Sequence, residues 1–251
     1  VTFDDVTDLV NAQRMAAWGD VARRIAHEIK NPLTPIQLSA ERLKQKFMPI
    51  AGENKESLIQ YTDVIIRQTG DLRRIVDEFS QFARMPVPQR CLSDLIKIID
   101  DVIHLETSRV SSRAKVLFEK PDPILLMIDP AMITQSLTNL IKNAGEAIET
   151  FISKNEIDEY QPIININVSN SELETIITIS DNGIGLPKDR TRLFEPYMTT
   201  REKGTGLGLP IVKKIIEEHS GEFYLEDAPI FENNSHIGTS ATIKFFKSEL
   251  R

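Results

Sequence analysis

The amino-acid sequence predicts an α+β protein of two domains, a helical hairpin followed by an α/β sandwich. The length of 251 residues suits two modest domains. Apolar residues recur at helical spacing before residue 90, whereas short apolar runs alternate with helical patterns after Cys91. Five of the eleven glycines lie between Gly183 and Gly208, so we expect the second domain to carry the functional loops.

Composition excludes several classes of protein. Hydrophobic residues make up 41% and charged residues 27%, which is typical of a globular protein and not of a disordered one. The net charge of −7, without a basic stripe, argues against nucleic-acid binding. The longest aliphatic run, residues 124–128, is far short of the roughly 20 residues that cross a bilayer, so we expect no direct membrane contact. A single cysteine, Cys91, indicates a reducing compartment such as the cytosol.

Two long amphipathic helices are predicted before residue 86. Apolar side chains recur at steps of three or four from Val21 to Phe47, and again from Leu58 to Ala83. A proline-rich segment at residues 85–88 ends the second helix. Two helices with apolar stripes cannot cover each other fully, so we expect two chains to pair into a dimeric four-helix bundle, which makes the protein a homodimer.

The second domain is expected to layer helices on one mixed sheet. Residues 151–161 are polar and weakly patterned, which predicts a loop. The predicted domain boundaries are 9–90 for the hairpin and 91–251 for the sandwich. The patterns predict helices over 93–106, 130–150 and 208–219, and strands over 115–119, 124–128, 162–168, 175–181, 221–227 and 238–246.

His27 is the first candidate functional residue. It follows Ile25 by two positions, so it faces away from the apolar stripe, and Pro32 in the same helix costs about 3 kcal/mol, which suggests a functional bend. A neutral imidazole is a nucleophile when an acceptor holds its other nitrogen, and Glu28 is the nearest acceptor. Asn31, one turn further along, could orient a water molecule. The alternative interpretation is a solvated helix face.

Asn139 and Asn143 lie four residues apart and form a polar ridge with Glu146 beside an apolar stripe. Amide and carboxylate oxygens suit a Mg²⁺ ion that bridges phosphates. Without such an ion, the same residues are ordinary members of an exposed helix face.

Asp181, Asn182 and Gly183 follow an apolar strand. An Asn-Gly pair at this place is typical of a hairpin turn, and a ligand-binding loop is an equally good interpretation. In a ligand-binding loop, the Asp181 carboxylate accepts a hydrogen bond from an amino group such as that of adenine. Gly183 and Gly185 then let the backbone approach the ligand.

A second glycine-rich loop, residues 204–208, leads into an amphipathic helix whose first N–H groups could bind phosphate. The loop lacks the Gly-Lys-Ser/Thr ending of a Walker A motif, and it does not follow a strand as a Rossmann fingerprint does. Residues 193–201 lie between the two loops and suit a mobile lid.

The order of these five segments resembles the sensor histidine kinases of two-component systems, over about residues 9 to 247. Residues 22–43 resemble the nitrogen-regulation NtrY group in particular. The segments correspond to the H box at 26–35, the N box at 135–147, the G1 box at 181–185, the F box at 193–200 and the G2 box at 204–210.

This resemblance implies a dimerisation and histidine-phosphotransfer domain followed by an ATP-binding domain of the gyrase and Hsp90 type. In that family His27 accepts the γ-phosphoryl group of ATP and Glu28 acts as general base. Asn143, with Asn139, binds Mg²⁺, and Asp181 holds adenine. The further ATP-binding residues that the resemblance implies are Lys142, Gly183, Gly185, Phe194, Thr199, Thr200, Arg201, Gly204, Thr205, Gly206, Leu207 and Gly208.

The resemblance also implies partners. The phosphoryl group passes from His27 to an aspartate on the receiver domain of a response regulator, and Asn31 places a water molecule for the reverse, phosphatase reaction. Residues 1–8 resemble the end of an upstream PAS-type sensory domain. Because members of this group are membrane-anchored, we expect the chain to be the cytosolic part of a longer inner-membrane sensor.

Two other functions are weighed against the kinase. A scaffold that binds ATP without transferring phosphate, or that acts mainly as a phosphatase, disagrees with the intact His27, Glu28 and Asn143. A free-standing ATPase of the gyrase and Hsp90 kind accounts for the nucleotide motifs but gives His27 and Pro32 no purpose.

Overall fold

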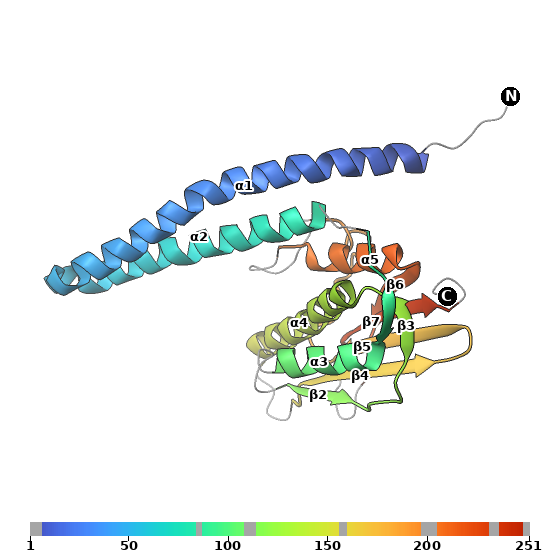
Figure 1. Cartoon of the computed structure of the whole chain (residues 1–251). Helices are drawn as coiled ribbons and strands as arrows, with labels where there is room; N and C mark the ends of the chain where they lie inside the picture. The colour runs from blue at the N-terminus through green and yellow to red at the C-terminus, as the bar shows by residue number, and fades with distance from the viewer. Residues whose placement is uncertain are drawn as a thin grey trace. The chain divides into compact units, whose positions relative to one another are not determined.

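The computed structural model of the chain describes residues 7–83, 87–107, 114–155, 160–196, 205–230 and 236–247. The chain folds as two compact units, residues 1–86 and 87–251 (Figure 1). Within the described ranges, no helix is both long enough and apolar enough to cross a membrane.

The first unit is a helical hairpin. Helices α1 (Thr7–Phe47) and α2 (Lys55–Ala83) lie side by side along the hairpin (Figure 1). Two short 3-10 turns, η1 (Met48–Ile50) and η2 (Gly52–Asn54), connect them. Gly52 has a φ of 53°, in the left-handed region that lets the chain reverse there. The predicted pair of long helices is thereby confirmed.

Helix α1 starts earlier than the apolar pattern predicts, at Thr7 and not near Val21. Of residues 1–8, expected to end an upstream domain, residues 1–6 lie outside the described part, while Thr7 and Asp8 are already helical. Pro32 and Pro35 lie inside α1, which continues through both of them (Figure 1).

The two helices of the hairpin meet along positions that are seven residues apart, the repeat of a coiled coil. Two of these positions are threonines, whose hydroxyls donate to backbone carbonyls four residues earlier, Thr62 to Leu58 at 2.7 Å and Thr69 to Ile65 at 2.8 Å. The hydroxyls are thus satisfied inside the seam. The buried seam consists of Ala26, Leu33 and Ala40 on α1 with Thr62, Thr69 and Val76 on α2.

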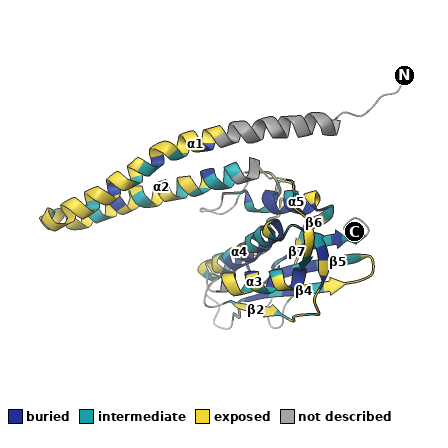
Figure 2. Ribbon diagram, viewed as in Figure 1, coloured by how far each residue is buried: buried dark blue, intermediate teal, exposed yellow. Residues whose placement is uncertain are grey.

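Most of the other described apolar residues of both stripes are exposed in the single chain, as expected for two helices that cannot cover each other fully (Figure 2). Leu58 and Phe79 are half-buried. Ile36 keeps 46% of its surface exposed and Leu72 keeps 43%. The physical reason is that one hairpin offers each helix a single neighbour, so only one seam can close. The exposed apolar residues of this second seam are Ile25, Ile29, Ile36, Leu43, Phe47, Ile65 and Leu72.

The second unit combines helices and strands in the order that the sequence predicts, apart from one added strand. Its helices are α3 (Leu95–Thr107), α4 (Pro130–Lys154) and α5 (Gly208–Glu218). Its strands are β1 (Cys91–Asp94), β2 (Lys115–Phe118), β3 (Leu125–Ile128), β4 (Ile163–Asn170), β5 (Glu174–Asp181), β6 (Gly221–Asp227) and β7 (Thr239–Phe246).

The strands form two sheets, whereas the sequence suggested one. Five of them form a mixed sheet in the order β2-β4-β5-β7-β6, in which only β2 and β4 are parallel. Strands β1 and β3 form a separate antiparallel pair, with Cys91 opposite Ile128. Residues 93 and 94, predicted as the start of a helix, belong to β1 instead. Strand β1 has only four residues, too few for a recognisable period.

Helix α4 is the central helix of the second unit. Asp129 caps it, with Oδ1 accepting from the backbone N–H groups of Ala131 at 3.0 Å and Met132 at 3.2 Å. The helix runs to Lys154, so the loop predicted over residues 151–161 is wrong for its first four residues. Phe151 explains the extension, because its ring packs against Tyr160 at a centroid distance of 4.9 Å.

Candidate functional site

His27 is exposed on α1, beside the buried Ala26 of the hairpin seam. Glu28 and Asn31 are exposed as well, and Asn31 follows His27 by one helical turn. The predicted solvent-facing position of His27 is therefore observed. An exposed imidazole with a carboxylate and an amide on the same stretch of helix is accessible to a phosphate donor and to water.

Ion pairs between α1 and α2 hold the His27 segment of the hairpin. Lys30 pairs with Asp77, and the ammonium of Lys44 lies 2.6 Å from Asp63 Oδ1. These pairs lie on either side of Leu33, which is buried in the seam. Because the pairs are partly exposed, we expect them to fix the alignment of the helices more than to stabilise them.

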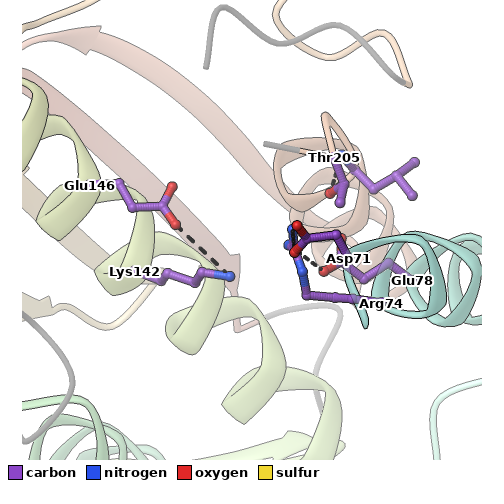
Figure 3. A network of polar contacts seen from close by, with 7 residues as sticks. Asp71, Arg74, Glu78, Lys142, Glu146 and Thr205 are labelled. Atoms are coloured by element: carbon purple, nitrogen blue, oxygen red, sulfur yellow. Dashed lines mark hydrogen bonds and ion pairs between the residues drawn. The ribbon is translucent and has the colours of Figure 1, made fainter. Parts of the chain in front are cut away.

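In the second unit, the polar ridge predicted on α4 is present. Asn139, Asn143 and Glu146 are half-buried, whereas Lys142 is exposed. The Lys142 ammonium lies 3.9 Å from Glu146 Oε1, one turn along the helix; Figure 3 shows this pair and, within α2, the ion pairs of Arg74. The other face of α4 is buried and includes Ile133, Leu137, Leu140, Ile141, Ala144, Ala147 and Ile148.

Asp181 ends strand β5 and is 4% exposed. Its Oδ1 accepts a hydrogen bond from the backbone N–H of Gly183 at 2.8 Å, which fixes the start of the loop. A Cβ atom at Gly183 would lie only 2.5 Å from the carbonyl carbon of Ala147, so the loop packs directly on α4. The Ile184 N–H donates to the Ala147 carbonyl at 3.2 Å. This Asn-Gly pair is therefore a loop docked on a helix and not a hairpin turn.

The second glycine loop comes to the same helix. Helix α5 begins at Gly208, where a Cβ atom would lie 3.7 Å from Asn143 Nδ2. Gly206 has a φ of 69°, in the left-handed region that residues other than glycine rarely adopt. The N-cap position of α5 is Leu207, whose side chain makes no capping hydrogen bond. A helix N-terminus beside an amide side chain suits a phosphate group.

Phe194 is half-buried between α5 and β6. Its ring meets Phe223 edge-on at a centroid distance of 5.7 Å, and the Lys213 ammonium lies 5.0 Å from its centroid. These contacts fix the start of the segment predicted to be a lid. The other candidates in that segment, Thr199, Thr200 and Arg201, lie outside the described residues, as does Gly204 of the second glycine loop.

Three residues that the motif analysis did not select lie against the Asp181 loop. A Cβ atom at Gly238 would lie 1.8 Å from the carbonyl oxygen of Asp181, so only glycine fits there. Tyr160 and His236 both contact the carbonyl oxygen of Asn182, at 2.8 Å and 2.5 Å. Of these three, only Gly238 has a signal in the sequence, as a glycine at the start of a predicted strand, and that signal is weak.

His219 is fully buried at the end of α5. Its Nδ1 contacts the Ile215 carbonyl at 2.7 Å, and its Nε2 contacts the Asp129 N–H at 3.0 Å. A carbonyl only accepts and an N–H only donates, so the ring is neutral with its proton on Nδ1. Burial lowers the pKa of His219, and Arg90 acts in the same direction. The imidazole thus links the end of α5 to the cap of α4.

The residues present fit a Mg²⁺ ion that is shared with phosphate. No cluster of three or more His, Cys, Asp or Glu side chains that could hold a metal occurs in the described part of the chain. Magnesium commonly takes one or two protein oxygens and completes its shell with phosphate oxygens and water. The Asn143 amide beside the start of α5 would be the side chain to contribute one such oxygen.

Two family descriptions match the chain. Residues 17–87 match the His Kinase A (phospho-acceptor) domain, and residues 128–249 match the Histidine kinase-, DNA gyrase B-, and HSP90-like ATPase. A phospho-acceptor hairpin followed by an ATPase domain of this type defines the catalytic core of a histidine kinase. The chain belongs to the sensor histidine kinases of two-component systems, and within them it resembles the NtrY group.

Similar proteins agree with this assignment. The nitrogen regulation protein NtrY of Azorhizobium caulinodans is 52% identical over 232 residues, which are 91% of this chain and 29% of that protein. The sensory histidine kinase/phosphatase NtrB of Rhodobacter capsulatus is 32% identical over 88% of this chain and 61% of its own length. The chain thus spans about a third of the NtrY protein that it matches.

Solved structures share the fold. Histidine kinase ThkA, in complex with the response regulator protein TrrA, superposes with a TM-score of 0.62 at 25% identity, over 99% of this chain and 69% of that chain. Full-length ShkA in complex with AMPPNP superposes with a TM-score of 0.65 at 18% identity, over 91% of this chain and 46% of that chain. The predicted hairpin and α/β ATPase fold is confirmed.

Proposed function

We propose that the chain transfers the γ-phosphoryl group of ATP to its own His27 and then to an aspartate on a response-regulator receiver domain. The observation that carries this proposal is the exposed His27 on the phospho-acceptor helix of a chain that also has a histidine kinase-type ATPase domain. Neither a scaffold nor a free-standing ATPase requires that histidine to be accessible.

In the hairpin, His27 would be the nucleophile and Glu28 the general base. One imidazole nitrogen attacks the γ-phosphorus of ATP, and Glu28 takes the proton from the ring as a general base. ADP leaves with the electrons of the broken P–O bond. Glu28 is exposed next to His27, so it can rotate to reach the ring. Such a transfer needs mainly positioning and charge stabilisation.

The second unit would hold the nucleotide through the segments that converge on α4. The Asp181 carboxylate would accept from the adenine amino group, and the start of α5 would face the phosphates. Asn143, with Asn139 one turn earlier, would contribute oxygens to Mg²⁺. The ion supplies charge neutralisation for the transferring phosphoryl group.

The same proposal includes a homodimer, a receiver-domain partner and a place on the cytosolic side of a bacterial inner membrane. The exposed second seam of the hairpin offers an apolar face for a second copy. The crystallised complex of ThkA with a response regulator protein supports a receiver-domain partner. The relatives named NtrY support a role in nitrogen regulation, and we place the chain on the cytosolic side of an inner-membrane sensor.

A phosphatase activity toward the regulator is a second part of the proposal. Asn31 lies one turn from His27 and is exposed, so its amide could orient a water molecule against a phosphorylated aspartate. The name of the similar NtrB protein, a histidine kinase/phosphatase, supports it. We expect Asn31→Ala to slow loss of phosphate from the regulator while His27 still becomes labelled.

The kinase is tested with γ-labelled ATP and Mg²⁺. We expect acid-labile, base-stable label on the parent chain and none on His27→Gln, because a phosphoramidate forms only on that ring. His104→Gln is the matched control, since His104 is also exposed and should leave labelling intact. ATP consumption without protein label would support the free-standing ATPase, and label on His27→Gln would show that another residue is the nucleophile.

A further inference from the structure

A cluster of three rings packs against the Asp181 loop and brings together three parts of the second unit that are far apart in the sequence. Phe151, at the end of α4, stacks on His236 with a centroid distance of 3.9 Å and an interplanar angle of 12°. Tyr160 packs against the same Phe151 ring at 4.9 Å. Residues from α4, from the segment before β4 and from the segment before β7 therefore meet at one point.

The rings converge on the carbonyl oxygen of Asn182. The Tyr160 hydroxyl donates to it at 2.8 Å and also lies 3.1 Å from Oδ1 of the same asparagine. The His236 Nε2 lies 2.5 Å away, and because a carbonyl only accepts, this nitrogen carries a proton. Burial, and then the charge of Asp181, raise the pKa of Tyr160, so its hydroxyl stays protonated and remains a donor.

Asn182 is 0% exposed, and its side chain is also held. Its Oδ1 accepts from the Ile163 N–H at 2.9 Å, and its Nδ2 donates to the Gln161 carbonyl at 2.7 Å. The backbone and the side chain of Asn182 are thus both bonded to neighbouring segments. Loss of one donor would leave a buried carbonyl short of a partner.

Asp181 precedes Asn182 directly, and its short side chain follows its backbone. Gly238 presses against the Asp181 carbonyl from the side of β7, and a Cβ atom at Gly185 would lie 2.6 Å from the Ile237 carbonyl oxygen. The backbone that carries the Asp181 carboxylate is therefore in contact with the segment 236–238 and with Tyr160.

We propose that Tyr160 and His236 are positioning residues that aim the Asp181 carboxylate at the amino group of adenine, and so determine the preference for adenine nucleotides. The inference rests on the proposed function, since Asp181 is the adenine contact only there. Neither residue belongs to a nucleotide-binding motif of the sequence. A displaced carboxylate would weaken the contact with the amino group and leave the phosphate contacts intact.

The test measures dissociation constants for ATP and for inosine triphosphate, with Mg²⁺, on the whole chain. Inosine triphosphate has a carbonyl oxygen in place of the adenine amino group, so it lacks the donor that the carboxylate would accept from. We expect the parent to prefer ATP by about tenfold. Tyr160→Phe and His236→Phe keep the rings and remove the donors, and each should lose roughly fivefold in ATP affinity with little change for inosine triphosphate.

Tyr224→Phe, on β6, is the matched control and should keep the full preference. His236→Gln keeps an N–H donor that His236→Phe lacks, so it should retain part of the preference for ATP. A parent that binds no ATP would refute the proposed function. A parent that prefers ATP, with variants that keep the preference or lose affinity for both nucleotides equally, would overturn the positioning role.

Discussion

His219 shows at the scale of one residue how a buried imidazole joins two helix ends. Both ring nitrogens are satisfied only in the neutral form, one by the Ile215 carbonyl and the other by the Asp129 N–H. A second proton would face the Asp129 N–H, which cannot accept it. Burial accordingly lowers the pKa of this histidine in the folded state.

We therefore expect acid to destabilise the second unit through His219. Its ordinary pKa is about 6.5 and its folded pKa is lower, so its stabilising contribution is complete above pH 6.5 and declines as the pH falls toward the folded value. In thermal unfolding of the whole chain, the unfolding temperature of the parent should exceed that of His219→Gln by more at pH 7.5 than at pH 5.5. A difference that does not change with pH would contradict this assignment.

Within the hairpin, Gly52 and Gly70 lie in different backbone conformations, so substitution should affect them in opposite directions. Gly70 lies inside α2 and Gly52 in the connecting turn, and a Cβ atom would have open space at both positions. They differ in backbone conformation, since Gly52 has a φ of 53°. The same substitution thus isolates backbone preference from packing.

We expect Gly70→Ala to raise the free energy of unfolding of the hairpin by about 1 kcal/mol, because alanine favours the helix. Gly52→Ala should lower it by about 1 kcal/mol, because an L side chain disfavours the left-handed region. Urea unfolding of both variants at one protein concentration measures the difference. Equal effects of the same sign would show that backbone conformation does not decide stability here.

The whole molecule leaves an apolar face of the hairpin uncovered in the single chain. Five of its residues, Ile29, Ile36, Leu43, Ile65 and Leu72, follow the same seven-residue spacing as the buried seam, shifted by three positions. A second copy of the chain would present the same face, so two hairpins could close both seams as a four-helix bundle.

We expect Ile36→Glu combined with Leu72→Glu to convert a dimer to a monomer, since each would place a charge in the apolar seam. Light scattering across a concentration series measures the mass. Gln45→Glu adds a charge to an exposed position of α1 and should leave the dimer intact. A parent that is monomeric at all concentrations would contradict the four-helix bundle.

The order of the elements could be predicted from the amino-acid sequence, because helix and strand periods are local and persist over many residues. It also identified His27, Asn143, Asp181 and Gly208 as candidates, since residue type and spacing carry their chemistry. Boundaries were less certain where the pattern was short, as for β1, or where polar residues hid a continuing helix, as at the end of α4.

The packing of the folded chain was needed to show which half of each apolar stripe closes within the hairpin, and that β1 pairs with β3. It also brought Tyr160 and His236 to one carbonyl oxygen, although they are 76 residues apart in the chain. Such contacts depend on the packing of distant segments, and the residues next to Tyr160 and His236 in the sequence form no pattern that predicts the contact.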